Sequence, residues 1–334
     1  MEFFKEFLTK MGLDSQAKWV RNFLLLGVNY LQDAINYFKH SSVFSKDKFY
    51  KMESDLIIAY HSIEKGFLHE KIKPKFAKDK VKFIISIIPR ILKLNEGQID
   101  GQILVAINVL IKYYEYHKNK NINISDYFSE ENYNYYKKYS NEKFNPSHLI
   151  SRLDFYKDSD SNFLKFSSSR KSIRNFNGEK VSNKIIHSVI ELANNAPSVC
   201  NRQSSKVYLV NDKAKINSIL KIQGGFTGYE KNVGQILILV SNKNCFYSIG
   251  ERNQMYIDGG IYLMNLLYSL HFYGIAACPA NWGKCVGDDK RVRKYLDIPM
   301  EQQIICIVPI GYANEKIAYA NSERRPSEQT LEIF

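Results

Sequence analysis

Three cations and a hydroxyl group stand within five residues near the middle of the chain. Arg170, Lys171, Ser172 and Arg174 lie in the segment SRKSIRNF (169–176). Arginine presents a planar fork of donors that matches phosphate oxygens, and serine adds a hydroxyl donor. These residue types at this spacing predict a site for a phosphate group, although a short basic run can also be solvated surface.

A second polar block follows about 20 residues later. The segment NAPSVCNRQ (195–203) presents Ser198, Asn201 and Gln203 on a loop that begins at Pro197. Their amide and hydroxyl groups can satisfy a polar heterocycle or a sugar-like chain. An ordinary turn is the alternative interpretation. Cys200 is expected to pack as a small hydrophobic residue, since no histidine is near it in the sequence.

The elements that must position these blocks lie in the second half of the chain. Hydrophobic periodicity predicts helices over 184–194 and 258–273 and strands over 206–210, 235–241 and 303–309. CPANW (278–282) is a constrained loop after the second helix, and Arg324 and Arg325 bring further cations near the end of the chain. The pattern is typical of an α+β fold.

The first half of the chain has a different pattern. Residues 1 to about 120 show apolar residues at helical spacing, as from Phe3 to Leu8 and from Trp19 to Leu31, and 117–150 is a polar connector. We therefore expect a helical N-terminal domain over 1–150 and a second domain over 151–334.

Composition narrows the class of protein. The formal net charge of +13 is spread over both halves of the chain, which suits phosphorylated ligands better than nucleic acid. The 5 cysteines form no CxxC pair, so no metal site is expected and a reducing compartment fits best. No apolar stretch reaches the roughly 20 residues of a membrane span. We expect a cytoplasmic protein without membrane contact.

The blocks, in this order, resemble the FMN-dependent nitroreductase family, whose RRSxRxF element precedes APSxxNxQPW, a DxGAxxxNL helix and a basic residue near the C-terminus. The resemblance covers about 163–334. Lys171 stands where the family usually has a second arginine, and Ser204 and Ser205 stand where it has proline and an aromatic residue. The resemblance implies a mainly antiparallel central sheet flanked by helices, in a homodimer with FMN at the interface.

The resemblance also implies roles for the individual residues. Arg170, Lys171 and Ser172 would hold the phosphate and ribityl end of FMN, with Arg324 or Arg325 completing the phosphate site. Arg174 would lie at the pyrimidine edge of the ring, where reduction builds negative charge. In the family the APSxxN loop reaches the flavin of the partner subunit, which gives this role to Pro197, Ser198, Asn201 and Gln203. The CPANW loop would pass near the hydride-accepting nitrogen through Pro279, Ala280 and Asn281.

By the same resemblance, the chain would be an FMN-dependent oxidoreductase, with Arg174, Ala280 and Asn281 as catalytic residues. It would pass a hydride from NADH or NADPH to a small organic acceptor in a ping-pong mechanism. The alternative is a scaffold or interaction module that keeps the fold with or without flavin.

One further segment lies in the helical half. HSIEKGF (61–67) is similar to an HxxEKGL signature of nitroreductase-like proteins associated with bacterial surface-polysaccharide gene sets. A structural ion pair at a helix end that a glycine terminates explains the residues as well as catalysis does.

Overall fold

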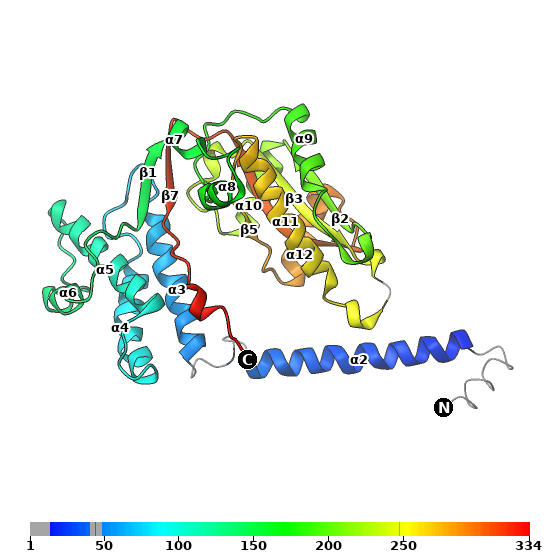
Figure 1. Cartoon of the computed structure of the whole chain (residues 1–334), viewed down its shortest axis with the longest axis horizontal. Coiled ribbons are helices and arrows are strands. Elements are labelled where there is room, and N and C mark those ends of the chain that lie inside the picture. The colour runs from blue at the N-terminus through cyan, green and yellow to red at the C-terminus, as the bar shows by residue number, and fades with distance from the viewer. Residues whose placement is uncertain (1–13, 41–43, 45–48, 247) are drawn as a thin grey trace. The chain divides into compact units, whose positions relative to one another are not determined.

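The computed structural model describes residues 14–40, 44, 49–246 and 248–334 (Figure 1). They divide into two compact units, one within 1–146 together with 322–334, and the other of residues 147–321. The helix predicted from Phe3 to Leu8 lies outside the described residues. The division of the chain into separate domains at residue 150 stays a prediction.

The first unit is helical, as predicted. Its helices are α2 (Asp14–His40), α3 (Phe49–Gly66), α4 (Lys78–Leu94), α5 (Gly101–Asn119) and α6 (Glu130–Lys137). Helices α3, α4 and α5 enclose a core that includes Leu56, Ile84 and Leu110. Gly66 is the last residue of α3, and a Cβ at this position would lie 2.3 Å from the ring of Phe76.

The second unit is built on an antiparallel sheet, as the resemblance implies. Strands β2 (Ser205–Val210), β3 (Gln235–Asn242), β6 (Gln302–Gly311) and β4 (Ala276–Ala277) follow one another in that order, and β5 (Ala280–Asn281) also pairs with β6. A two-stranded sheet pairs β1 (Ser147–Ser151) with β7 (Lys316–Ala320). The predicted strands at 206–210, 235–241 and 303–309 are confirmed.

Helices cover both faces of the sheet, because successive side chains of a strand point to opposite faces. Leu237 and Leu239 of β3 share a core with Leu266 of α11 (Gln254–Phe272) and Val189 of α9 (Asn183–Ala193). On the other face, α10 (Lys213–Gln223) packs on β3 and on α12 (Val286–Leu296). Figure 1 shows α11 lying along the sheet beside α9. Two short helices, α7 (Arg152–Tyr156) and α8 (Phe163–Ser169), precede the basic segment.

Helix α11 approaches its neighbours closely at two points. The Nδ2 group of Asn265 donates to the carbonyl oxygens of Leu192 and Ala193 at 3.1 and 2.9 Å, at the end of α9. A Cβ at Gly259 would lie 2.8 Å from Ile305, whereas one at Gly260 would meet nothing within 4 Å. The sequence predicts close packing at both glycines. That prediction holds for Gly259 and is wrong for Gly260.

Candidate functional site

The basic segment is held in an extended form beside the short strand β4. The amide of Ile173 donates to the carbonyl oxygen of Ala277 at 2.9 Å, and Phe176 forms an isolated antiparallel bridge with Ala313. Both Ile173 and Phe176 are buried. Between these two anchors, Arg174 and Asn175 are half-buried.

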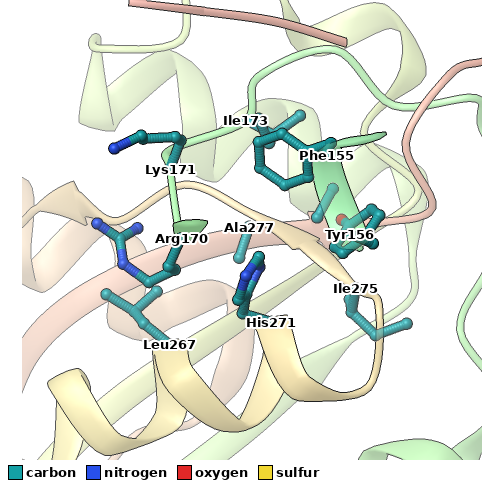
Figure 2. Close-up of a pocket in the computed structure, with 10 residues that line it drawn as sticks. Phe155, Tyr156, Arg170, Lys171, Ile173, Leu267, His271, Ile275 and Ala277 are labelled. Atoms are coloured by element: carbon teal, nitrogen blue, oxygen red, sulfur yellow. The ribbon is translucent and has the colours of Figure 1, made fainter. Parts of the chain in front are cut away.

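Arg170 and Lys171 line a small pocket of about 10 Å³ together with residues of α7 and α11. Figure 2 shows His271, from α11, in the middle of this view between Arg170 and Tyr156. Phe155 and Tyr156 stand on the side away from the two cations. The pocket combines two cations with aromatic walls, and its volume is about that of one water molecule.

His271 is neutral in this pocket. Burial, and then the charges of Arg170 and Lys171, lower the pKa of His271 to about 4. The hydroxyl of Ser169 donates to the carbonyl oxygen of Phe166, so Nε2 of His271 carries the proton and donates to the Ser169 hydroxyl oxygen at 2.7 Å. Sequence reasoning missed His271 and Tyr156, because neither lies in a polar cluster of the sequence.

Arg174 carries a buried donor without an acceptor. Its Nε atom makes no hydrogen bond with any part of the chain that the structure describes. Burial raises the pKa of Tyr229 to about 12, and the positive charge of Arg174 opposes that shift while Cys278 adds to it. The basic segment and the start of CPANW therefore meet near Tyr229. A buried N–H group without a partner is rare in folded proteins and indicates a missing acceptor.

The CPANW loop runs along the sheet edge. Ala280 and Asn281 pair with Ile307 and Cys306 of β6. The carbonyl oxygen of Asn281 accepts a hydrogen bond from Gln223 at 3.1 Å. Ala280 is buried, whereas Pro279 is half-buried and the Asn281 side chain is exposed. The sheet thus fixes the backbone of this loop, and it is the backbone that the family resemblance places near the ligand.

The predicted 195–203 loop lines a second pocket, of about 200 Å³. Pro197, Ser198 and Gln203 face it together with Asp258 and Tyr262 of α11. Asn201 is exposed. Arg170 and Lys171 thus line the first pocket, and Pro197, Ser198 and Gln203 line the second. Neither pocket is lined by the other predicted site residues of this unit, which are Ser172, Arg174, Asn201, Pro279, Ala280 and Asn281.

The loop has a strained backbone. Cys200, Asn201 and Gln203 have positive φ angles of 49°, 56° and 48°, which residues other than glycine seldom adopt. Cys200 is exposed, so the prediction that it packs as a small hydrophobic residue is wrong.

Two anchors hold this loop, and sequence reasoning missed both. The carboxylate of Asp258 accepts from the amide of Val199 at 3.3 Å. The guanidinium of Arg202 donates to both carboxylate oxygens of Glu251 at 2.6 and 3.0 Å, and to the carbonyl oxygen of Cys245 at 2.7 Å. Arg202 stands inside the predicted motif, but its partner is 49 residues away in the chain and the sequence gives no signal for it.

Arg324 and Arg325 belong to the helical unit. Arg325 forms an ion pair with the buried carboxylate of Glu53 at 2.7 Å, and Arg324 donates to the carbonyl oxygen of Ser322 at 2.6 Å. Their predicted contact with a phosphate stays a prediction. In the same unit Nδ1 of His61 lies 2.9 Å from the buried carboxylate of Glu64, three residues further along α3. The other oxygen of this carboxylate, Oε1, has no hydrogen-bond partner among the described residues. The structural and the catalytic interpretations of HSIEKGF both stay predictions.

Within the described ranges there is no group of three or more His, Cys, Asp or Glu side chains that could hold a metal ion. Among the same residues, no helix is both long enough and apolar enough to cross a membrane.

The comparisons with known proteins bear on the sheet unit. The model of the Nitroreductase family matches residues 168–232 and 231–312. No curated protein matches the chain.

Solved structures similar to this chain include three nitroreductase-like proteins. One, from Desulfovibrio desulfuricans in complex with FMN, has 20% identity over 52% of this chain and 99% of its own, with a TM-score of 0.45. An FMN-dependent nitroreductase from Clostridium difficile has 22% identity over 49% and 94%, with a TM-score of 0.41. A nitroreductase-like protein from Streptococcus mutans has 22% identity over 52% and 98%, with a TM-score of 0.43.

The family match includes the basic segment, the 195–203 loop, CPANW and the four-strand path of the sheet. Residues 168–312 are therefore a domain of the nitroreductase family of oxidoreductases, and a helical extension precedes them. This confirms the family and the fold class that the sequence resemblance implies.

Proposed function

We propose that this domain binds FMN and transfers a hydride from NADH or NADPH to a small organic acceptor by a ping-pong mechanism. When bound, FMN supplies a ring that can take up and give off a hydride. The observation that carries the proposal is the buried Nε–H of Arg174, which has no acceptor among the described residues and lies where the basic segment meets the CPANW loop.

The donor set fits FMN chemically. Arg170, Lys171 and Ser172 offer two cations and a hydroxyl for a phosphate, and His271 beside them is neutral, so the two cations supply the positive charge. Arg174 would direct its unused N–H toward the ring edge that gains negative charge on reduction, which favours the reduced form. These residues bind and orient the cofactor, so no separate acid or base is needed for the hydride step.

The CPANW backbone and the 195–203 loop would complete the site. Pro279, Ala280 and Asn281 lie at or beside the backbone that β6 fixes, so main-chain groups there are preorganised for a ligand. The doubly anchored 195–203 loop would reach the flavin of a partner subunit through Pro197, Ser198, Asn201 and Gln203. The working form would then be a homodimer, in the cytoplasm.

One segment outside this domain, HSIEKGF (61–67), guides the choice of acceptors to assay. The resemblance of HSIEKGF to proteins of surface-polysaccharide gene sets makes nucleotide-linked and lipid-linked sugars the first acceptors to assay.

Binding of FMN to Arg170→Ala tests the proposal. The expected result is at least a tenfold weaker affinity for FMN, measured by the fluorescence of free flavin at equilibrium, because a charge-assisted bond to phosphate is lost. Lys165→Ala is the matched control, since Lys165 is an exposed cation on α8 close to Arg170 in sequence. Equal FMN affinity in the two variants would remove the phosphate assignment.

A further inference from the structure

Helix α2 carries an apolar face that stays exposed. Eleven of its large apolar side chains are 37–66% exposed. Seven of the eleven lie along or beside one stripe of the helix: Val20, Leu24, Leu25, Val28, Leu31, Ile35 and Phe38. The other four, Trp19, Phe23, Leu26 and Tyr30, lie on other sides of the helix. A contiguous exposed apolar stripe is typical of a surface that meets a partner.

The spacing on this face selects the kind of partner. Leu24, Val28, Leu31, Ile35 and Phe38 recur at alternating intervals of four and three residues, which is a heptad repeat. The β-branched Val28 and Ile35 occupy the a positions, and Leu24, Leu31 and Phe38 occupy the d positions. This assignment of β-branched and leucine residues favours a parallel two-stranded coiled coil. We propose that α2 pairs in parallel with α2 of a second copy of this chain.

The polar face of α2 favours a second copy over a lipid surface. Helices that lie on membranes have polar faces rich in lysine and arginine. Here that face carries four amides, Asn22, Asn29, Gln32 and Asn36, against two lysines, Lys18 and Lys39, and Gln32 and Asn36 hydrogen bond to each other along it at 2.9 Å. The flanking positions place no two like charges across a parallel seam, because Val20, Gly27 and Ala34 would face Leu25, Gln32 and Lys39. Arg21 occupies the a position one heptad before Val28, and a single polar residue at an a position sets the register of a coiled coil at a cost in stability.

This inference does not rest on the proposed function, because it concerns a helix outside the nitroreductase domain. Cysteine cross-linking in the full-length protein tests it. Leu24→Cys places a thiol at a d position, which faces its own equivalent only in a parallel pair. Asn36→Cys places one on the exposed polar face as the matched control. Copper phenanthroline oxidation should link Leu24→Cys between chains at least tenfold faster than Asn36→Cys, with the 24–24 disulfide identified by mass spectrometry.

A second variant keeps the test independent of thiol chemistry. Leu24→Asp with Leu31→Asp changes two exposed side chains and should raise the dissociation constant for self-association at least tenfold in sedimentation, whereas Asn29→Asp with Asn36→Asp should not. Equal cross-linking of the two cysteine variants would overturn the inference. So would binding of α2 to phosphatidylcholine and phosphatidylglycerol vesicles without a 24–24 link. Whether or not Arg170→Ala weakens FMN binding, the result of cross-linking on α2 is unchanged, so the two proposals can fail separately.

Discussion

The side chain of Arg174 combines a fixed charge with a free donor. Ile173 is anchored to Ala277 beside it, and Nε is buried without an acceptor among the residues that the structure describes. The surrounding protein thus holds a donor ready before any ligand arrives. Preorganised donors of this kind stabilise charge that develops during a reaction, because no reorganisation is needed at that moment.

Removal of this cation should change redox chemistry more than folding. Arg174→Ala should retain FMN and lower its midpoint potential by about 30–60 mV, because a hydrogen bond to a charged group contributes about 1.5–3 kcal/mol and 30 mV corresponds to about 1.4 kcal/mol for two electrons. Spectroelectrochemical titration measures this, and Arg174→Lys, which keeps the charge, should recover part of the difference. A potential equal to that of the wild type would exclude the role proposed for Arg174.

His271 makes the stability of the protein depend on pH. Its folded pKa is lowered to about 4 from 6.5, so the unfolded state binds more protons between these values. Stability should therefore fall as the pH falls through this window, with about 2 kcal/mol of the loss between pH 7 and pH 5. In urea unfolding, the unfolding free energy of His271→Gln should fall less between pH 7 and pH 5 than that of the wild type, since the other titrating groups are common to both proteins. Equal falls in unfolding free energy would show that His271 does not carry the effect.

At the scale of elements, α11 depends on one glycine and not on its neighbour. Gly259→Ala would place a methyl group 2.8 Å from Ile305, and such overpacking should cost about 1–3 kcal/mol of unfolding free energy. Gly260→Ala meets nothing within 4 Å, so higher helix propensity should leave stability equal or raise it by up to about 1 kcal/mol. Urea unfolding of both variants checks the pair, and equal losses would contradict the close approach at Gly259.

The 195–203 loop depends on the ion pair of Arg202 with Glu251. Arg202→Ala should cost about 1–3 kcal/mol, because it leaves a half-buried carboxylate and the Cys245 carbonyl group without this donor. Arg291→Ala is the matched control: Arg291 pairs with Asp288 at the surface, where such pairs contribute under about 1 kcal/mol. If the two substitutions reduced the unfolding free energy equally, Arg202 would not be the anchor of the loop.

Local periodicity was sufficient to predict the central elements of the sheet unit. Strands such as β3 are continuous apolar runs, and α9 and α11 carry clear helical patterns, so each element is encoded within about 20 residues. The loop anchors were not predictable in this way. Asp258 with Val199, and Arg202 with Glu251, meet only because α11 and the segment before it return to the loop. Cys200 is exposed and has a positive φ angle, neither of which composition reveals.

For the whole molecule, the chain joins a nitroreductase-family domain to a helical unit with its own core. The basic segment, the CPANW backbone and the 195–203 loop all lie in the sheet unit, whereas Arg324 and Arg325 belong to the helical unit. The flavin chemistry that we propose therefore depends chiefly on the sheet unit. The contribution of α2, in contrast, is to self-association.

Anaerobic reduction followed in the visible spectrum tests the central claim most directly. The full-length protein, supplied with FMN and freed of unbound flavin, should show flavin absorption that bleaches on addition of NADH or NADPH and returns when an acceptor is added. A protein that retains no flavin, or whose bound flavin neither donor bleaches, would contradict the account.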